Sequence, residues 1–314
     1  MFERENIMLK KIIKNVESVI VGKRGVIELV VTALISNGHI LLEDVPGVGK
    51  TRLIAAVARS IDGSFKRIQF TADVLPSDVT GFSVYNQKTG DFEFKNGAIM
   101  SQFVLADEIN RTSPKTQAAL LEAMEEKQIS VDGVTYKMPQ PFMVMATQNP
   151  IEFMGTFPLP EAQLDRFLIK ISVGYPDAES ERSVLSMHQM DDPFETLQAV
   201  ATPEDIINIQ NEVKKVFVHE NLEKYIVSIV SATRNHPSVR LGASPRASLA
   251  LYRTAQATAY INGRDFVIPD DIQKMVIPVM AHRIILSQET KFSNTTADDV
   301  LNEIKKSVPV PSGK

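Results

Sequence analysis

The stretch of sequence that decides the fold is Ile40-Leu41-Leu42-Glu43-Asp44-Val45-Pro46-Gly47-Val48-Gly49-Lys50-Thr51. It has the pattern of a short apolar strand, a tight glycine turn and a helix that begins at Lys50. Gly47 and Gly49 allow the backbone to turn sharply and to approach a ligand closely, because neither residue has a Cβ atom. The N–H groups of such a turn and of the helix N-terminus point at one spot and attract an anion there. The stretch therefore predicts a phosphate-binding loop.

Two side chains of this loop suit a nucleotide. Lys50 can place its charge at the outer phosphates, and the hydroxyl of Thr51 can hold Mg²⁺. One position departs from the common pattern, since Asp44 stands six residues before the lysine, where glycine is usual. The alternative is a glycine turn that only joins a strand to a helix, and residues farther along the chain favour the phosphate-binding loop. We expect ATP to contact the residues around the turn, which are Pro46, Gly47, Val48, Gly49, Lys50, Thr51 and Arg52.

Composition limits the class of protein. The chain has 314 residues, of which 44% are apolar, and this suits a globular protein of two domains. Its net charge is −4, with acids and bases interspersed, whereas nucleic-acid binders usually have a basic excess. We therefore do not expect nucleic acid as an obligate partner. The absence of cysteine excludes disulfides and thiolate chemistry, and the five histidines lack the spacing of a metal site.

The sequence shows no signal for secretion or for membrane insertion. Charged residues interrupt the apolar positions near the N-terminus, and the longest apolar runs elsewhere are far shorter than a bilayer requires. This pattern predicts a soluble cytoplasmic protein.

Strand and helix patterns alternate over about the first 185 residues. Helices are expected first at about 6–17 and 25–35, and apolar strands then alternate with helices. Such alternation predicts a parallel sheet that helices cover on both faces. The expected strands are a short one that begins at Ile40 and residues 65–70, 101–106, 142–147 and 167–173, and the helices between them are residues 50–60 and 115–126.

Two segments of this first part do not fit the alternation. Residues 71–97 contain proline, several glycines and short alternating pieces, which indicate an inserted β-hairpin. Residues 128–140 indicate a second hairpin, with Asp132-Gly133 as its turn. An insertion of this size in a compact domain is usually functional.

The strand pattern ends near residue 178, and helices are expected from there to about residue 282. We therefore predict an α/β nucleotide-binding domain over residues 1–190 and a smaller all-helical domain over residues 191–314. The tail from residue 305 is expected to be loose.

A pair of carboxylates follows one of the predicted strands. Asp107 and Glu108 come directly after the apolar run that ends at Ala106. Beside a phosphate loop, Asp107 would reach Mg²⁺, and Glu108 would orient and polarise the attacking water. The alternative is a helix cap or a solvated turn. The combination with the phosphate loop favours the catalytic interpretation.

Three further residues are candidates for contacts with the γ-phosphate. Asn149 follows another strand, and its alternative is a turn residue before a proline. Arg166 precedes the last strand, and its alternative is an ion pair with Asp165 or Glu161. Arg246 opens a helix, where a positive charge is unfavourable for the helix dipole, so an anion such as a phosphate is expected to offset it.

Taken together, these motifs resemble those of the AAA+ ATPases and, within them, of the MoxR family. They occur in the family's order and cover nearly the whole chain, and this family tolerates an aspartate at position 44. The matching stretches are residues 41–51, Ala106-Asp107-Glu108-Ile109-Asn110-Arg111, residues 117–124, Ala146-Thr147-Gln148-Asn149-Pro150, residues 160–167 and Gly242-Ala243-Ser244-Pro245-Arg246.

The resemblance implies a role for each matched position. Walker A would include Lys50 and Thr51, Walker B would be Asp107 and Glu108, and the adenine would be bordered by Val21 and Gly22. Sensor 1 would be Asn149, the arginine finger that completes a neighbour's site would be Arg166, and sensor 2 on the lid would be Arg246. The fold implied is a P-loop AAA+ core, a parallel sheet flanked by helices, with an all-helical lid.

The resemblance also implies an activity. We expect an oligomeric ring, a hexamer, that hydrolyses ATP with Mg²⁺ and remodels partner proteins, helping them to mature or to receive a cofactor. Partners of the family often contain von Willebrand factor A domains, and both hairpins would face the ring's pore or a partner. Two alternatives stay open: a nucleic-acid-dependent motor, and an ATP-gated binding module with slow turnover.

Overall fold

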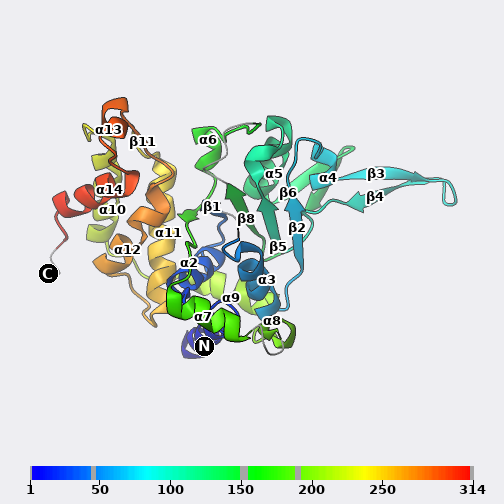
Figure 1. Ribbon diagram of the computed structural model, residues 1–314, viewed down its shortest axis with the longest axis horizontal. Coiled ribbons are helices and arrows are strands. Elements are labelled where there is room, and N and C mark those ends of the chain that lie inside the picture. Colours follow the sequence, from blue (N-terminus) through cyan, green and yellow to red (C-terminus); the bar gives the residue numbers. More distant parts are fainter. Residues whose placement is uncertain (1, 44–46, 149–154, 188–191, 312–314) are drawn as a thin grey trace.

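The computed structural model describes residues 2–43, 47–148, 155–187 and 192–311. Figure 1 shows a central sheet with its helices, a group of helices on one side of it, and a two-stranded arm that projects from the opposite side. Within the described residues, no helix combines the length and the apolar character needed to cross a bilayer.

The central sheet has five parallel strands in the order β2 (Phe65–Gln69), β5 (Phe103–Asp107), β8 (Met143–Gln148), β1 (Ile40–Glu43) and β9 (Ile169–Ile171). Every neighbouring pair is parallel, so all five carboxyl ends lie at one edge of the sheet, the carboxyl edge, and all amino ends at the other, the amino edge. The predicted parallel sheet is confirmed.

Alternate residues of the central strands face two separate apolar cores. In β8, Met143 and Met145 belong to one core, whereas Val144 and Ala146 belong to the other. The first core contains residues of α1 (Phe2–Glu17), α2 (Arg24–Ile35) and α3 (Lys50–Ser60), and the second contains residues of α5 (Pro114–Glu126). Burial on both faces is the reason why these strands contain unbroken apolar runs such as residues 143–146.

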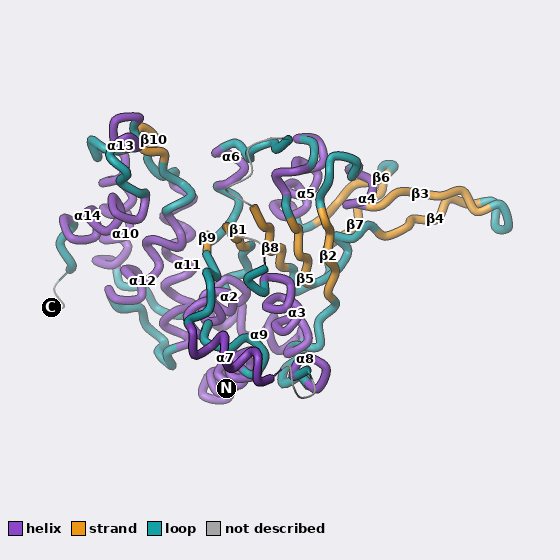
Figure 2. The backbone as a smooth tube through the Cα atoms, in the orientation of Figure 1, coloured by secondary structure: helices purple, strands orange, loops and turns teal. Residues whose placement is uncertain are grey.

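Both predicted hairpins are present. The first consists of β3 (Gly81–Asn86) and β4 (Asp91–Asn96), follows the short helix α4 (Pro76–Thr80), and forms the projecting arm in Figures 1 and 2. The second consists of β6 (Gln128–Val131) and β7 (Val134–Lys137). The rings of Phe94 and Tyr136 stack with centroids 4.0 Å apart, so the two hairpins are joined at their bases.

The remaining elements are mostly helical. A 3₁₀ turn (Ile109–Arg111) follows β5, and α6 (Glu161–Leu164) precedes β9. The helices after β9 are α7 (Ala178–Met187), α8 (Pro193–Thr196), α9 (Pro203–Val213), α10 (Glu220–Arg234), α11 (Pro245–Ile261), α12 (Pro269–Met280), α13 (Gln288–Phe292) and α14 (Ala297–Ser307). We refer to α9 to α14 as the helical region.

Two features of the helical region differ from the prediction. A short antiparallel pair, β10 (Val239–Leu241) with β11 (Ile285–Leu286), lies among the helices. The prediction of a loose tail is wrong as far as Ser307, because α14 begins with a capping box at Thr296 and Asp299 and buries Val300, Leu301 and Ile304. The helix pattern was hidden by the many polar residues on its exposed face.

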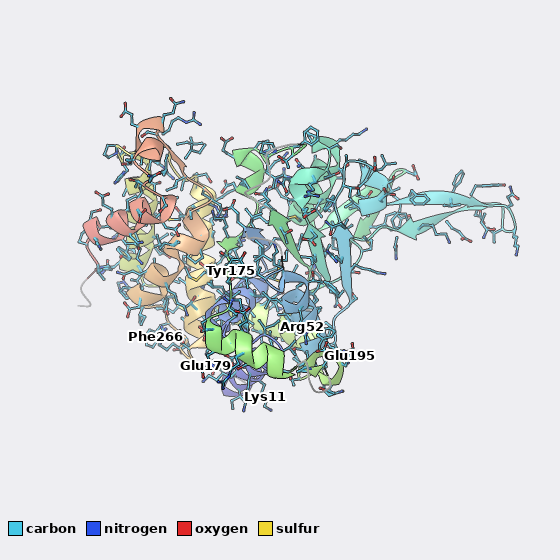
Figure 3. The ribbon with its side chains drawn as sticks, viewed as in Figure 1. Lys11, Arg52, Tyr175, Glu179, Glu195 and Phe266 are labelled. Atoms are coloured by element: carbon cyan, nitrogen blue, oxygen red, sulfur yellow. The ribbon has the colours of Figure 1, made fainter. Side chains whose placement is uncertain are left out.

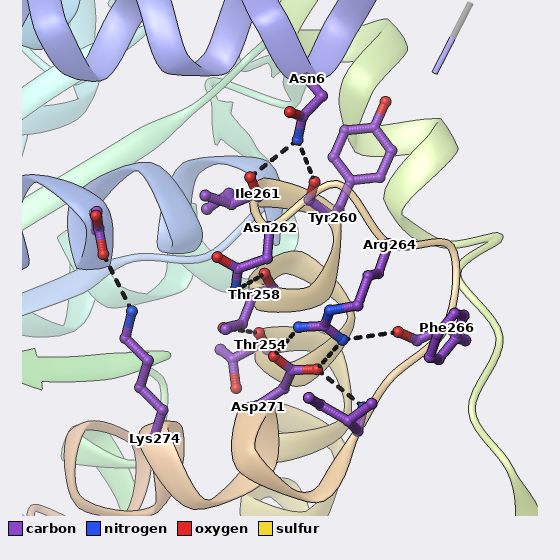
Figure 4. Close-up of polar contacts among 12 residues, drawn as sticks. Asn6, Thr254, Thr258, Tyr260, Ile261, Asn262, Arg264, Phe266, Asp271 and Lys274 are labelled. Atoms are coloured by element: carbon purple, nitrogen blue, oxygen red, sulfur yellow. Dashed lines mark hydrogen bonds and ion pairs between the residues drawn. The ribbon is translucent and has the colours of Figure 1, made fainter. Parts of the chain in front are cut away.

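The helical region is attached to the first part of the chain by polar and apolar contacts. Figure 4 shows Asn6 of α1 donating hydrogen bonds to the carbonyl groups of Tyr260 and Ile261, at 2.6 and 2.9 Å, where α11 ends. The same view shows a contact within the helical region itself, where Arg264 donates two hydrogen bonds, of 2.7 and 2.6 Å, to the buried Asp271. The first apolar core continues from the sheet into these helices. The domain boundary at residues 190 and 191 therefore stays a prediction.

Candidate nucleotide site

The glycine turn has the backbone conformation that a phosphate loop needs. Gly47 and Gly49 have φ values of 86° and 81°, and α3 begins at the next residue, Lys50, as predicted. A Cβ atom added to either glycine would meet nothing within 4 Å, so positive φ rather than crowding is the reason for glycine here. Pro46 lies outside the described residues.

The turn and the carboxyl edge of the sheet line one cavity of about 440 Å³. The loop and the start of α3 contribute one side of this nucleotide cavity, and the ends of β2, β5 and β8 contribute the other. The structure therefore brings together the predicted Walker A and Walker B residues. The lining residues are Gly47, Gly49, Lys50, Thr51, Arg52, Arg67, Gln69, Asp107, Glu108 and Thr147.

Both carboxylate oxygens of Asp107 have partners in the cavity. Oδ1 accepts a hydrogen bond from the hydroxyl of Thr147 at 2.6 Å, and Oδ2 accepts one from Arg67 at 2.6 Å. The sequence analysis did not single out Arg67 or its neighbour on the same face, Gln69. The alternation of β2 could have indicated them, because Lys66 and Ile68 point the other way.

The backbone of Glu108 does not adopt the right-handed helical conformation. Its φ is 57°, in the left-handed region that is uncommon for a residue with a side chain, and its N–H donates to Thr147 at 2.8 Å. Its Oε2 accepts from Gln69 at 2.8 Å and lies 3.3 Å from Nε of Arg111. It caps the following 3₁₀ turn with no side-chain hydrogen bond. Glu108 thus occupies the N-cap position, but its carboxylate makes no capping hydrogen bond, and backbone strain of this kind is typical of functional sites.

The oxygen donors of the cavity fit a magnesium ion. Thr51 and Asp107 both line it, and hard cations prefer hydroxyl and carboxylate oxygen. Mg²⁺ is usually held by one or two carboxylates together with substrate phosphates. The described residues contain no group of three or more histidine or acidic side chains that could hold a metal by themselves.

Arg52 points toward the segment after α7. Its Nη2 pairs with Asp192, the N-cap residue of α8, and its buried Nε has no hydrogen-bond partner in the described part of the chain. Figure 3 shows Arg52 on the side of the molecule where α7 lies.

The predicted adenine segment lies against α7. Gly22 has a φ of 74°, and a Cβ atom there would lie 2.0 Å from Oγ of Ser180. Lys23 donates a hydrogen bond to the carbonyl of Tyr175 at 2.7 Å. Neither Val21 nor Gly22 lines the nucleotide cavity, so their contact with adenine stays a prediction.

The two predicted arginines lie at the amino edge of the sheet. The N–H of Leu168 donates to the carbonyl of His39, immediately before β1, so the segment that carries Arg166 lies at the opposite edge from Lys50. Neither Arg166 nor Arg246 lines the nucleotide cavity.

Both arginines pair with one carboxylate. Nε of Arg166 lies 3.0 Å from one oxygen of Glu125, and Nη2 of Arg246 lies 2.5 Å from the other. The alternative for Arg166, an ion pair with Asp165 or Glu161, is not found among the described residues, where Asp165 pairs with Arg283 of the helical region. The anion that offsets the charge of Arg246 is Glu125 in this structure.

This group of arginines borders a second cavity, of about 770 Å³. The carboxylates that line it are Glu125 and Asp165, whereas the cations are Lys127, Arg166, Lys214, Arg246, Arg253 and Arg283. Burial lowers the pKa of Lys127, and the charges of Arg253 and Lys214 lower it further. The C-terminal ends of α5 and α9 attract some of these cations. The cavity nevertheless has more cations than acids.

Asn149, the predicted sensor 1, lies outside the described residues. The roles assigned to the other site residues stay predictions, although the structure places the Walker residues together and the two arginines together.

Comparisons with known proteins agree with this geometry. Residues 39–169 match the family described as "ATPase family associated with various cellular activities (AAA)", and residues 231–304 match the AAA lid domain. The chain is 54% identical to the uncharacterized protein YeaC of Bacillus subtilis, over 97% of this chain and 95% of that protein. It is 42% identical to Chaperone MoxR1 of Mycobacterium tuberculosis, over 96% and 82% respectively. A crystal structure of a candidate ATPase from Cytophaga hutchinsonii is 41% identical, covers 99% of this chain and 97% of its own, and superposes with a TM-score of 0.93.

Proposed function

The chain belongs to the MoxR family of AAA+ ATPases, and we propose that it binds and hydrolyses ATP in the nucleotide cavity. The observation that carries the proposal is that Lys50, Thr51, Asp107 and Glu108, from two distant parts of the sequence, line one cavity at the carboxyl edge. A lone glycine turn could serve only to join a strand to a helix. A glycine turn facing two carboxylates has the groups that phosphoryl transfer needs.

Each side chain has a part in the proposed reaction. Lys50 and the N–H groups of the turn bind the phosphates, and Thr51 and Asp107 hold Mg²⁺. The ion, when bound, neutralises charge that develops on the phosphate oxygens. Arg67 supplies a positive charge beside Asp107.

Glu108 is the proposed general base. Its carboxylate orients the attacking water and accepts its proton, while Gln69 and Arg111 determine where the carboxylate points. Asn149 as sensor 1 rests on the resemblance of its sequence motif.

The position of the two arginines supports hydrolysis between subunits. Arg166 and Arg246 lie side by side at the amino edge, whereas the nucleotide cavity of the same chain lies at the carboxyl edge. A head-to-tail contact would bring the arginines of one subunit to the γ-phosphate of the next, and such contacts close into rings. An arginine keeps its charge and presents a planar fork, which suits stabilisation of the transferring phosphoryl group. We propose a hexameric ring on this basis and on the family resemblance.

Mixed rings test this arrangement. A Lys50→Ala subunit cannot bind ATP but still presents Arg166, whereas an Arg166→Ala subunit binds ATP and presents no finger. Each pure preparation should be nearly inactive, since such fingers contribute about 10³–10⁵ in rate. Mixtures should recover part of the hydrolysis, because some interfaces combine an intact loop with an intact finger. Mixtures that co-assemble and stay inactive would show that Arg166 does not act in trans.

We further propose that hydrolysis drives remodelling of partner proteins, which the name Chaperone MoxR1 of a relative supports. The exposed side chains of the projecting arm support it as well. Phe92 is 74% exposed, and Tyr85 and Phe82 are about half exposed, although large aromatic side chains are seldom left in water without a use. Partners with von Willebrand factor A domains are proposed from the family resemblance.

Shortening the tip of the arm, residues 88–91, tests the partner role. Basal hydrolysis should be unchanged, because the tip lies outside both cavities. In a Glu108→Gln background, which traps ATP, the shortened form should lose the proteins that co-purify with the intact arm. The double variant Tyr85→Ser and Phe92→Ser should act in the same way. The centroids of these two rings lie 5.4 Å apart, and replacing both leaves the base of the arm intact. Unchanged co-purification, or hydrolysis that requires DNA, would contradict the proposal.

A further inference from the structure

Arg283 binds the segment on either side of Arg166. Its side chain is only 3% exposed, and its Nε donates to Oδ1 of Asp165 at 2.8 Å. Its Nη1 donates to the carbonyl of Leu168 at 3.0 Å and to that of Val279. Its Nη2 donates to the carbonyl groups of Phe167 and Asp165 at 2.5 and 3.3 Å. All three guanidinium nitrogens therefore donate hydrogen bonds, and each of them donates to residues 165–168.

Two neighbouring residues of the helical region hold the same segment. Ser244, the N-cap of α11, donates to the second carboxylate oxygen of Asp165 at 2.7 Å and accepts from the N–H of Arg246 at 3.1 Å. Nε2 of His282 lies 3.1 Å from the carbonyl of Phe167. Burial lowers the pKa of His282 well below its usual value, so the ring is neutral and donates to this carbonyl. Asp165 therefore connects the segment of Arg166 with the N-terminus of α11, whose second residue is Arg246.

The sheet alone gives this segment little support. β9 has only three residues, and α6 has only four, so residues 165–168 are a short connection between two short elements. The pair of Arg166 with Glu125 lies at the surface, with both side chains about one-third exposed. Surface ion pairs contribute little to order, whereas a buried arginine with all its donors occupied is held in one geometry.

We propose that Arg283 is a positioning residue that, through Asp165, fixes Arg166 and Arg246 as one unit on the helical region. This inference rests on the proposed action of Arg166 on the ATP of a neighbouring subunit. Any movement of the helical region then moves both arginines together toward or away from that ATP. Arg283 does not touch the nucleotide itself, because it acts only through the segment it binds.

The test uses Arg283→Lys and a matched control, Arg264→Lys. Lysine keeps the positive charge but lacks the planar fork that reaches several carbonyl groups at once. Arg264 has a similar two-pronged contact with a buried carboxylate, Asp271, in the same helical region, and it does not contact residues 165–168. Both changes should destabilise the fold, but only Arg283→Lys should displace Arg166.

For Arg283→Lys we expect an ATP dissociation constant within about twofold of the parent and a kcat lower by about 10²-fold, the scale of a misplacement of about 1 Å. Arg264→Lys should keep most of the parent kcat at the same temperature. Mixed rings then distinguish a positioning role of Arg283 from a general loss of stability. Arg283→Lys mixed with Lys50→Ala should recover activity, because one subunit offers an intact loop and the other an intact finger. Arg283→Lys mixed with Arg166→Ala should stay inactive.

Each other outcome overturns a defined statement. If Arg264→Lys lowers kcat as much as Arg283→Lys, or if both mixtures behave alike, Arg283 has only a structural role. If Arg166→Ala with Lys50→Ala fails to recover despite co-assembly, the proposed action between subunits fails first. If Arg283→Lys does not fold, Asp165→Asn replaces it, because the amide keeps the shape and the hydrogen bond from Ser244 while weakening the pair with Arg283. The same mixing pattern is expected for it.

Discussion

The two edges of the central sheet differ in how their functional residues arrive there. At the carboxyl edge, Lys50, Asp107 and Glu108 follow directly from strand ends and a glycine turn, so local backbone geometry places them. At the amino edge, Arg166 and Arg246 come from a short connection and from the helical region, and they meet on Glu125 of α5. In the proposed function, one edge binds the nucleotide through locally placed groups, while the other supplies charges that complete a neighbour's site.

The charges of the two edges are also complementary. At the carboxyl edge, Asp107 and Glu108 form ion pairs with Arg67 and Arg111. The cavity at the amino edge contains more cations than acids. A nucleotide with its phosphates would make the carboxyl edge strongly negative. The amino edge of another subunit would then offset that charge, and this complementarity supports the proposed head-to-tail contact.

The largest expected effect is on ATP affinity, which should depend on the carboxyl edge and not on the amino edge. Lys50→Ala should abolish ATP binding or weaken it severely, because Lys50 supplies the cation of the glycine turn. Arg246→Ala should leave the affinity of dilute, unassembled subunits within about twofold, the scale expected for a surface residue far from the ligand. Titration with a labelled nucleotide measures both. Equal losses would remove the distinction between the edges, and normal binding by Lys50→Ala would contradict the assignment of the loop.

A second prediction separates binding from turnover at the carboxyl edge itself. Glu108→Gln keeps the shape of the side chain and its contact with Gln69 but removes the base that polarises water. Hydrolysis should fall by roughly 10²-fold or more, while ATP affinity is retained. Steady-state hydrolysis and the nucleotide titration together measure this. Near-normal turnover would mean that Glu108 is a structural carboxylate.

The smallest expected effect concerns stability at the amino edge. His39 is buried, with Nδ1 accepting from the N–H of Val144 and Nε2 facing the carbonyl of Met124. Burial lowers its pKa from 6.5 to about 4, so the folded state contains a neutral ring that the unfolded chain would protonate. The stabilisation is present above about pH 6.5 and is lost between pH 6.5 and 4, by up to about 1.4 kcal/mol for each pH unit.

Denaturant unfolding across this pH range checks the prediction. His39→Gln should be less stable at neutral pH, yet its free energy of unfolding should depend less on pH than that of the parent. The exposed His219, changed to Gln, is the control for the replacement of a histidine by glutamine at the surface. A parent slope that His39→Gln does not alter would assign the acid sensitivity to other groups.

Local signals predicted much of the fold. The helices at Lys50–Ser60 and Pro245–Ile261 have the expected bounds, because Gly49 starts one and Ser244 with Pro245 starts the other. The second hairpin follows from its turn at Asp132 and Gly133, both with positive φ. The short pair of β10 and β11 was missed because two-residue and three-residue strands have too few side chains to show a period.

The sequence by itself determined the phosphate loop, the carboxylates after β5 and the parallel sheet, since turn, cap and alternation are properties of neighbouring residues. Only the tertiary structure decided which side chains meet. Glu125 forms ion pairs with Arg166 and Arg246. Asp165 forms an ion pair with Arg283. Both sets of residues meet because the helical region packs against the first part of the chain. Arg246 and Glu125 are 121 residues apart, and no local pattern specifies a contact at that separation. Such pairs depend on the sum of many packing contacts across the whole chain, which is why the sequence did not indicate Glu125 as the partner of both arginines.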